Sequence, residues 1–155
     1  MRLAISGTPG SGKTTFARAL GKRLGFEVLN EKDFALKNKI GSFNDQDELE
    51  IPIEEFEKKA NLYLEKKDNV ILEGHTLCEM KLKVDKFITI SIDPEKLQLR
   101  LELRKYSEEK IMDNIFCEGI EYCKKHAKRN YGSKLIIIES KEEEQMLSLV
   151  LAKLG

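Results

Sequence analysis

Residues 7–15 read Gly7-Thr8-Pro9-Gly10-Ser11-Gly12-Lys13-Thr14-Thr15, and this stretch decides the fold. It fits the pattern G-x-x-x-x-G-K-[ST], which forms a loop that holds phosphate groups. An apolar, strand-like run (residues 3–6) precedes it, and a helix-like run (residues 16–24) follows it, which is the context the pattern requires. A glycine-rich turn without a ligand would need neither the lysine nor the threonine. The stretch therefore predicts a phosphate-binding loop, or P-loop.

The residue types in the loop indicate how each part would contact a nucleotide. Glycines let the backbone N–H groups point inward, and the start of the following helix adds its own free N–H groups and positive dipole end. Lys13 can reach the β- and γ-phosphates of ATP, and the Thr14 hydroxyl can bind Mg²⁺. We therefore expect ATP to be bound by Gly10, Ser11, Gly12, Lys13, Thr14 and Thr15.

The composition limits the class of protein. The chain has 155 residues, of which 41% are hydrophobic and 35% charged, and its net charge is zero. This length suits one domain with a real core, which we take to cover residues 1–155. No apolar run is long enough to cross a membrane, and the zero net charge argues against bulk attraction to DNA or other nucleic acid.

The beginning of the chain and its cysteines indicate the compartment. A strand-like run begins at Leu3, which is not the pattern of a signal peptide. The three cysteines are odd in number and lack the spacing of a zinc site, so we expect reduced thiols in a cytoplasmic protein. We expect a monomer or a weak oligomer.

Apolar runs of two kinds alternate along the chain. Strand-like runs occur at 3–6, 26–29, 70–72, 87–92 and 135–139. Helix-like runs occur at 13–24, 53–64, 93–103, 107–129 and 140–154, the last beginning with a capping-box pattern at 140–143. This alternation predicts an α/β fold with a five-stranded parallel sheet and flanking helices, and with its site at the carboxyl ends of the strands.

The stretch from 31 to 52 shows no clear period, and we expect a mobile or weakly helical excursion there. Acidic residues gather at its far end and just beyond it: Asp45, Asp47, Glu48, Glu50, Glu54, Glu55 and Glu57. Such residues repel a phosphate but attract a basic protein. A solvated acidic face is the alternative explanation for most of them.

The apolar run at 70–72 ends in Glu73-Gly74-His75. A carboxylate at this position orients Mg²⁺ or its waters beside the P-loop threonine, so we predict that Thr14 and Glu73 form the metal site. Gly74 would let the backbone approach a ligand closely, and His75 could orient a water or a phosphate oxygen. The alternative is an ordinary polar turn at the end of a strand.

Arg100 and Arg104 are four residues apart on a predicted helix and so share one face. Two cations placed there repel each other, and an anion between them would remove that cost. Arg104 also lies at a short polar junction between two helices, which suits a lid that brings arginines to a transferring phosphoryl group. We predict that both arginines are catalytic and that Arg104 also contacts ATP. The alternative is two solvated arginines paired with nearby glutamates.

Three motifs together resemble a known family. They are the loop at 7–15, Glu73-Gly74-His75, and the block Arg100-Leu101-x-x-Arg104-x-Tyr106 followed by Lys110-x-x-Asp113-Asn114-Ile115-x-x-Glu118. In this combination the chain is similar, over nearly its whole length, to the adenylate kinase isoenzyme six family and its archaeal relatives. The family often has Asp where Glu73 stands, and the extra methylene moves the carboxylate.

The resemblance implies a P-loop nucleoside monophosphate kinase fold with a small AMP-side region at about 30–53 and a short lid at about 100–110. It implies the reaction ATP + AMP ⇌ 2 ADP with Mg²⁺, together with ATPase activity. It further implies association with a basic small-subunit ribosomal protein during maturation of the small ribosomal subunit. Lys13, Arg100, Arg104 and His75 would be the catalytic residues.

Two other functions stay open from the sequence. One is a cytidylate kinase or another small-metabolite P-loop kinase, although archaeal cytidylate kinases usually have Thr where Lys13 stands. The other is a ribosome assembly factor that uses ATP as a conformational switch and has little kinase activity. An acceptor screen separates the first from an adenylate kinase, and binding to ribosomal proteins with and without ATP tests the second.

Overall fold

The apolar runs expected to form strands assemble into one parallel sheet in the computed structural model, which describes residues 1–155. The sheet has the order β2-β5-β1-β6-β7, and every neighbouring pair in it is parallel. Its strands are β1 (Arg2–Gly7), β2 (Glu27–Asn30), β5 (Val70–Glu73), β6 (Lys86–Ser91) and β7 (Leu135–Glu139). The predicted five-stranded parallel sheet is confirmed.

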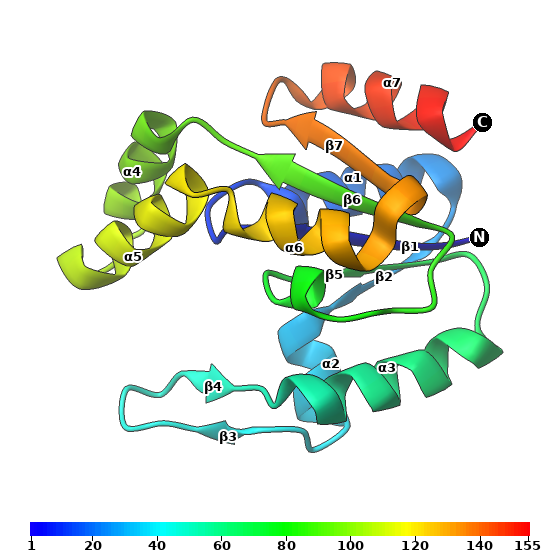
Figure 1. The fold of residues 1–155 in the computed structure, drawn as a ribbon, viewed down its shortest axis with the longest axis horizontal. Coiled ribbons are helices and arrows are strands. Elements are labelled where there is room, and N and C mark those ends of the chain that lie inside the picture. Colours follow the sequence, from blue (N-terminus) through cyan, green and yellow to red (C-terminus); the bar gives the residue numbers. More distant parts are fainter.

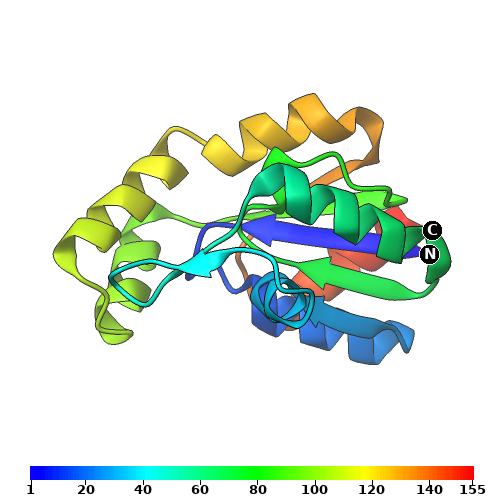
Figure 2. The ribbon, with the colours of Figure 1, turned by 90° about the horizontal axis from the view of Figure 1, so that it is seen from below.

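Helices cover both faces of the sheet, which is why its strands are apolar on both sides. Helices α1 (Lys13–Leu24) and α7 (Glu143–Leu154) cover one face, where a cluster of 13 buried residues joins them to the strands. Helices α3 (Ile53–Lys66) and α6 (Tyr122–Tyr131) cover the other face (Figures 1 and 2).

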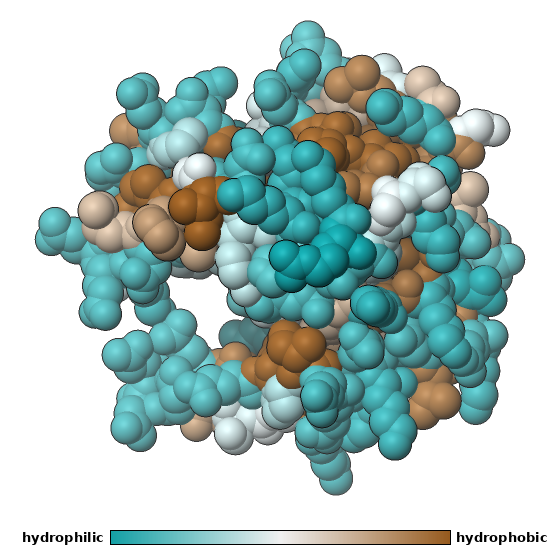
Figure 3. All heavy atoms as spheres, viewed as in Figure 1, coloured by the Kyte–Doolittle hydropathy of each residue, from teal (hydrophilic) through white to brown (hydrophobic).

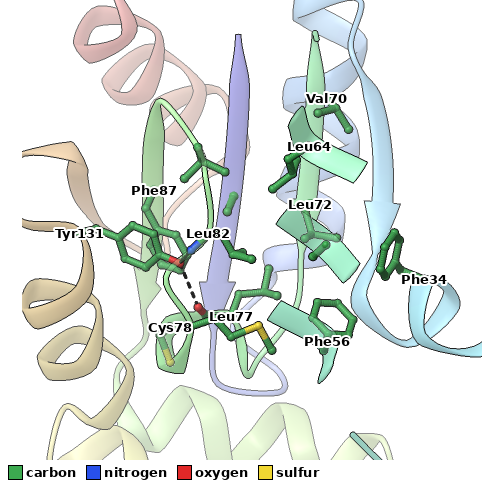
Figure 4. Packing of buried hydrophobic residues seen from close by; sticks show 14 of the residues in the cluster. Phe34, Phe56, Leu64, Val70, Leu72, Leu77, Cys78, Leu82, Phe87 and Tyr131 are labelled. Atoms are coloured by element: carbon green, nitrogen blue, oxygen red, sulfur yellow. Dashed lines mark hydrogen bonds between the residues drawn. The ribbon is translucent and has the colours of Figure 1, made fainter. Parts of the chain in front are cut away.

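The core on the α3 and α6 face is the larger one, with 17 buried residues. The rings of Phe87 on β6 and Tyr131 on α6 are stacked with their centroids 3.9 Å apart (Figure 4). The Tyr131 hydroxyl donates to the Leu77 carbonyl and accepts from the Leu82 amide, so this buried phenol is fully hydrogen-bonded. Burial raises the pKa of Tyr131.

Local capping explains several helix ends. Gly25 ends α1 in the left-handed region at φ 73°, and the Asp93 side chain accepts from the Glu95 amide at the start of α4 (Pro94–Leu103). Ser107 caps α5 (Glu108–Gly119) by accepting from the Lys110 amide at 3.2 Å. These three helix ends lie within one residue of the end of the run expected at 13–24 and of the starts of the runs expected at 93–103 and 107–129.

Two expected helices differ from the structure. The single helix expected over 107–129 is wrong, because the chain breaks at Ile120–Glu121, where Glu121 has φ 57°. α5 packs on α4 while α6 packs on the sheet, so one straight helix could not serve both surfaces. The capping box expected at 140–143 is also wrong, because α7 begins at Glu143 and its cap residue makes no side-chain hydrogen bond.

The stretch 31–52 is more ordered than its sequence indicates. It forms helix α2 (Glu31–Lys37) and an antiparallel hairpin of β3 (Ser42–Phe43) and β4 (Leu49–Glu50). Asn30 caps α2, and Phe34 anchors it in the core against Phe56 with ring centroids 5.3 Å apart. Seven residues of helix are too few to show a clear period, which is why the pattern was missed.

The carboxyl ends of the strands point toward the side from which α4, α5 and the β3–β4 hairpin project (Figure 1). Short 3₁₀ turns complete the chain at η1 (Leu77–Glu79) and η2 (Gly132–Lys134). The structure contains no helix with the length and apolar character needed to cross a bilayer.

Candidate active site

The P-loop connects β1 to α1 in a conformation that depends on two glycines. Gly10 and Gly12 have φ values of 90° and 93°, in the left-handed region that residues with a Cβ rarely adopt. A Cβ on Gly10 would lie 2.9 Å from Leu97 of α4, so the loop also packs too closely for a side chain there. The Ser11 hydroxyl in this loop is buried and has no hydrogen-bond partner. The Ser11 oxygen packs against Gly7, where a Cβ would lie 2.6 Å from it.

Thr14 and Glu73 meet across the ends of α1 and β5. Both oxygens of the Glu73 carboxylate accept from the Thr14 hydroxyl at 3.1 Å, and Oε1 also accepts from Asn30 Nδ2 at 2.6 Å. Glu73 is only 1% exposed. The parallel register pairs Asn30 with Glu73 at the ends of β2 and β5, so the sheet itself brings these groups together.

This oxygen set fits Mg²⁺, which prefers carboxylate and hydroxyl oxygens and keeps several sites for water and substrate phosphates. Thr14 Oγ1 and Glu73 lie beside the P-loop, where a nucleotide's phosphates would supply further oxygens. The predicted pair is therefore close enough to share one ion.

Lys13 is buried among charged side chains. Burial lowers the pKa of its ammonium group, the carboxylates of Glu73 and Glu31 act in the opposite direction, and Arg104 lowers it further. The phosphates of a bound nucleotide would add negative charge and so favour the charged form of the ammonium group.

Glu31 is a second buried carboxylate at this edge of the sheet, and it is 2% exposed. It accepts from the amide and the hydroxyl of Thr76, and its Oε2 lies 3.4 Å from Nδ1 of His75. The His75 side chain remains 54% exposed. Glu31 therefore holds one side of the imidazole while the other side faces solvent.

Gly74 packs closely against a neighbouring side chain. A Cβ on Gly74 would lie 2.4 Å from Cβ of Glu31. The glycine therefore makes room for the Glu31 side chain, a contact that the sequence did not indicate.

Arg100 and Arg104 lie on the opposite side of the loop. Arg100 Nη1 donates to the Gly10 carbonyl at 3.0 Å, and its Nη2 lies 3.5 Å from the Ser140 hydroxyl. Arg104 is exposed, and its guanidinium makes no hydrogen bond or ion pair. Both line a cavity of about 280 Å³ together with Ser11, Gly12, Thr15 and Lys141. The structure thus brings the two predicted arginines to the P-loop.

Two further contacts connect the site to the projecting elements. The Glu118 carboxylate of α5 accepts from the Thr8 hydroxyl at 2.5 Å and from the Ile92 amide at 2.8 Å. Lys110 of α5 pairs with Glu48 of the β3–β4 turn at 3.1 Å. In the space-filling view an opening separates the α4–α5 projection from the hairpin (Figure 3).

Sequence reasoning missed Glu31 as a site residue. The available signal was its position two residues after the strand-like run at 26–29, as Glu73 follows the run at 70–72. Carboxyl ends of parallel strands meet at one edge, so both carboxylates could have been placed there. The order of the strands, which makes β2 and β5 neighbours, was not readable from the sequence.

Comparisons with known proteins show the family to which this chain belongs. A family model described as an AAA domain matches residues 3–121. A protein of Methanocaldococcus jannaschii named "Putative adenylate kinase" is 37% identical over 125 residues, covering 79% of this chain and 70% of the relative. A protein of the same name from Sulfurisphaera tokodaii is 33% identical over 98% of this chain and 81% of the relative. This chain belongs to the family of these archaeal adenylate kinase relatives.

Solved structures of P-loop kinases have the same fold as this chain. A shikimate kinase from Acinetobacter baumannii aligns with a TM-score of 0.67 at 17% identity, covering 98% of this chain and 93% of the other. A shikimate kinase from Aquifex aeolicus aligns with a TM-score of 0.65 at 19% identity, covering 99% and 96%. The predicted α/β P-loop kinase fold is therefore confirmed.

Proposed function

We propose that this protein is an adenylate kinase that transfers the γ-phosphoryl group of ATP to AMP with Mg²⁺ and forms two ADP. The observation that carries the proposal is that two buried, hydrogen-bonded carboxylates lie beside the P-loop: Glu73 at the end of β5 and Glu31 at the start of α2. The names of the archaeal relatives support the same activity.

The transfer requires one bond to form and one to break. A phosphate oxygen of AMP attacks the γ-phosphorus, and the bond from that phosphorus to the β-γ bridging oxygen breaks, with both oxygens in line. Positioning and charge stabilisation supply most of the catalysis in such reactions, so no covalent enzyme intermediate is required.

The P-loop amides from Gly10 to Thr15 hold the phosphates of ATP, and Lys13 follows the migrating phosphoryl group. Thr14 and Glu73 would hold Mg²⁺, which would neutralise negative charge on the phosphates of ATP. Asn30 fixes the Glu73 carboxylate by its 2.6 Å hydrogen bond.

Arginines close the site from the other side. Arg100 is already anchored on the Gly10 carbonyl, so it stabilises the loop and the phosphates together. Arg104 at the end of α4 moves over the transferring group as part of a short lid at about 100–110. The segment at about 30–53 covers AMP. The ion pair between Lys110 and Glu48 connects this segment to the lid.

His75 orients the acceptor phosphate or, when AMP is absent, a water that attacks ATP. Its Nδ1 lies 3.4 Å from buried Glu31, which fixes the imidazole. His75→Ala should therefore reduce ATPase activity more than transfer to AMP. Equal losses in both activities would remove the water-orienting role.

The direct test of the activity is an acceptor screen that measures ADP formed from Mg-ATP with each nucleoside monophosphate and with shikimate. We expect AMP to be the preferred acceptor. A preference for CMP would assign a cytidylate kinase, and ADP formation without any acceptor dependence would leave only the ATPase.

A role in small-subunit maturation rests on the acidic hairpin. Asp45, Asp47 and Glu50 are exposed around the β3–β4 turn and present negative charge to a basic partner. Capture of a basic small-subunit ribosomal protein, with and without ATP, tests this role. An ATP-dependent interaction together with negligible transfer to AMP would favour the assembly factor over the kinase.

A further inference from the structure

The face of α5 that packs on α4 ends in a charged residue where its spacing predicts an apolar one. Ile111 and Ile115 of α5 pack against Leu97 and Leu101 of α4 in a small separate core (Figure 1). Glu118 follows three residues after Ile115 and seven after Ile111, so it continues the same face of the helix. A carboxylate on a packed face is costly unless it is hydrogen-bonded, so its donors show what this position does.

The Glu118 carboxylate accepts from two different parts of the fold. One oxygen, Oε2, accepts from the Thr8 hydroxyl of the P-loop at 2.5 Å. The other, Oε1, accepts from the Ile92 amide at 2.8 Å. Ile92 lies beyond the last residue pair that β6 forms with β1 and with β7, so Glu118 supplies an acceptor that the sheet does not.

Thr8 is the residue through which α5 contacts the P-loop. It is 7% exposed, and its carbonyl accepts from the Ser11 amide at 3.0 Å, which closes the first turn of the loop. From α4, Arg100 holds the same turn by its hydrogen bond to the Gly10 carbonyl. This turn leads directly into the amides from Gly10 to Thr15 that are expected to contact phosphates, so its position sets theirs.

We propose that Glu118 is a positioning residue, which fixes the P-loop in its phosphate-binding shape by holding Thr8 from α5. The inference rests on the proposed function only in taking the P-loop as the nucleotide site. A hydroxyl that donates to an ionised carboxylate forms one of the stronger hydrogen bonds in proteins. Glutamine cannot replace Glu118 fully, because it has one acceptor oxygen and its NH₂ group would face the second donor.

The test compares variants on the two sides of the hydrogen bond between Glu118 and Thr8. In calorimetry, Glu118→Gln and Thr8→Val should each weaken the binding of Mg-ADP about tenfold, because each removes a charge-assisted bond to the loop. Thr8→Ser keeps the hydroxyl and should bind within about threefold of the wild type. Asp113→Asn removes an exposed carboxylate from the same helix and should bind within about twofold.

A double variant shows whether the two residues act through one bond. Glu118→Gln combined with Thr8→Val should weaken the binding of Mg-ADP by no more than about 20-fold, since the second change finds the bond already broken. Independent effects would multiply to about 10²-fold, and this result would overturn the proposal. So would a Thr8→Ser variant that binds as weakly as Thr8→Val.

Thermal melting separates positioning from simple support of the fold. A purely structural Glu118 would lower the melting temperature of Glu118→Gln but leave the Mg-ADP affinity, measured well below that temperature, at the wild-type value, which would overturn the proposal. If Glu118→Gln fails to fold, Thr8→Val against Thr8→Ser gives the same comparison. The calorimetry needs no acceptor, so a wild type that fails to phosphorylate AMP would remove the proposed kinase activity and leave the affinity differences, and with them the role of Glu118, in place.

Discussion

The two sides of the P-loop are built differently. On the β5 side, Glu73 and Glu31 are buried and are hydrogen-bonded by Thr14, Asn30 and Thr76. On the α4 side, Arg104 is exposed and without a partner. A buried carboxylate is costly unless its hydrogen bonds are complete, so the β5 side has to be assembled when the chain folds. An exposed arginine has no such cost of burial, so it needs no partner before the nucleotide binds.

Because of this difference, we expect substitutions on the two sides of the P-loop to affect stability and catalytic rate differently. Changes on the α4 side should alter the rate and leave stability unchanged, whereas changes on the β5 side should alter both. Arg100 lies between the two cases, since it is anchored on the Gly10 carbonyl and also lines the cavity with Arg104.

The largest expected effect is on the α4 side. Arg104→Ala should lower the rate of transfer by about 10³-fold, in the range found for arginines that stabilise a transferring phosphoryl group. Its melting temperature should equal that of the wild type, because the side chain is exposed and unpaired. Arg129→Ala, another exposed arginine, serves as the control for charge removal. A loss of tenfold or less in Arg104→Ala would remove the lid from the mechanism.

A smaller effect is expected at the proposed metal site on the β5 side. Glu73→Gln should reduce kcat/KM by about 10²-fold and raise the Mg²⁺ concentration needed for half-maximal rate, because the carboxylate charge that holds the ion is lost. A magnesium titration of the initial rate measures this, with Glu54→Gln as the matched control. An unchanged magnesium requirement would exclude Glu73 from the metal site.

Gly74 and Gly119 form a matched pair for stability. Gly74→Ala should destabilise the fold by about 1–3 kcal/mol, since the new Cβ would lie 2.4 Å from Cβ of Glu31. Gly119→Ala meets no atom within 4 Å and should stabilise α5 by up to about 1 kcal/mol. Urea unfolding of both variants gives the difference directly. Equal effects in the two variants would show that the Glu31 packing does not constrain the β5 side.

The smallest expected effect concerns pH and lies outside both sides of the loop. The hydrogen bond to Glu79 raises the pKa of Tyr122 from 10.0 to about 12. A raised folded-state pKa gives stability that is present below pH 10 and is lost as the pH rises toward 12. The melting temperature of wild type should therefore exceed that of Tyr122→Phe at pH 8, and the gap should narrow by pH 11. A gap that does not change with pH would rule out this hydrogen bond as its source.

The sequence predicted the parts of this molecule that depend on local patterns. The P-loop and the five strands follow from residue types at short spacing, and both are confirmed. The order of the strands is set by packing over the whole chain, so the meeting of Asn30 with Glu73 was not predictable. The break at Glu121 arises because α5 and α6 cover different surfaces, which no local pattern records.

The sequence likewise predicted some residues of the candidate site and missed others. Lys13, Thr14, Glu73 and the two arginines belong to motifs, and the structure brings them to one loop. Glu31 belongs to no motif, and the close packing of Gly74 against the Glu31 side chain has no signal in the sequence. The residues that support the motif residues therefore required the structure.

The central claim is that the P-loop and the β5 side bind the nucleotide before the arginines contact the transferring phosphoryl group. Calorimetric titration of Mg-ATP into the wild type, Lys13→Ala and Arg104→Ala tests this claim most directly. We predict saturable binding by the wild type, affinity in Arg104→Ala within about tenfold of the wild type, and loss of more than about 10²-fold in Lys13→Ala, which should keep its fold. No detectable binding by the wild type, or equal affinity in Lys13→Ala, would contradict the account.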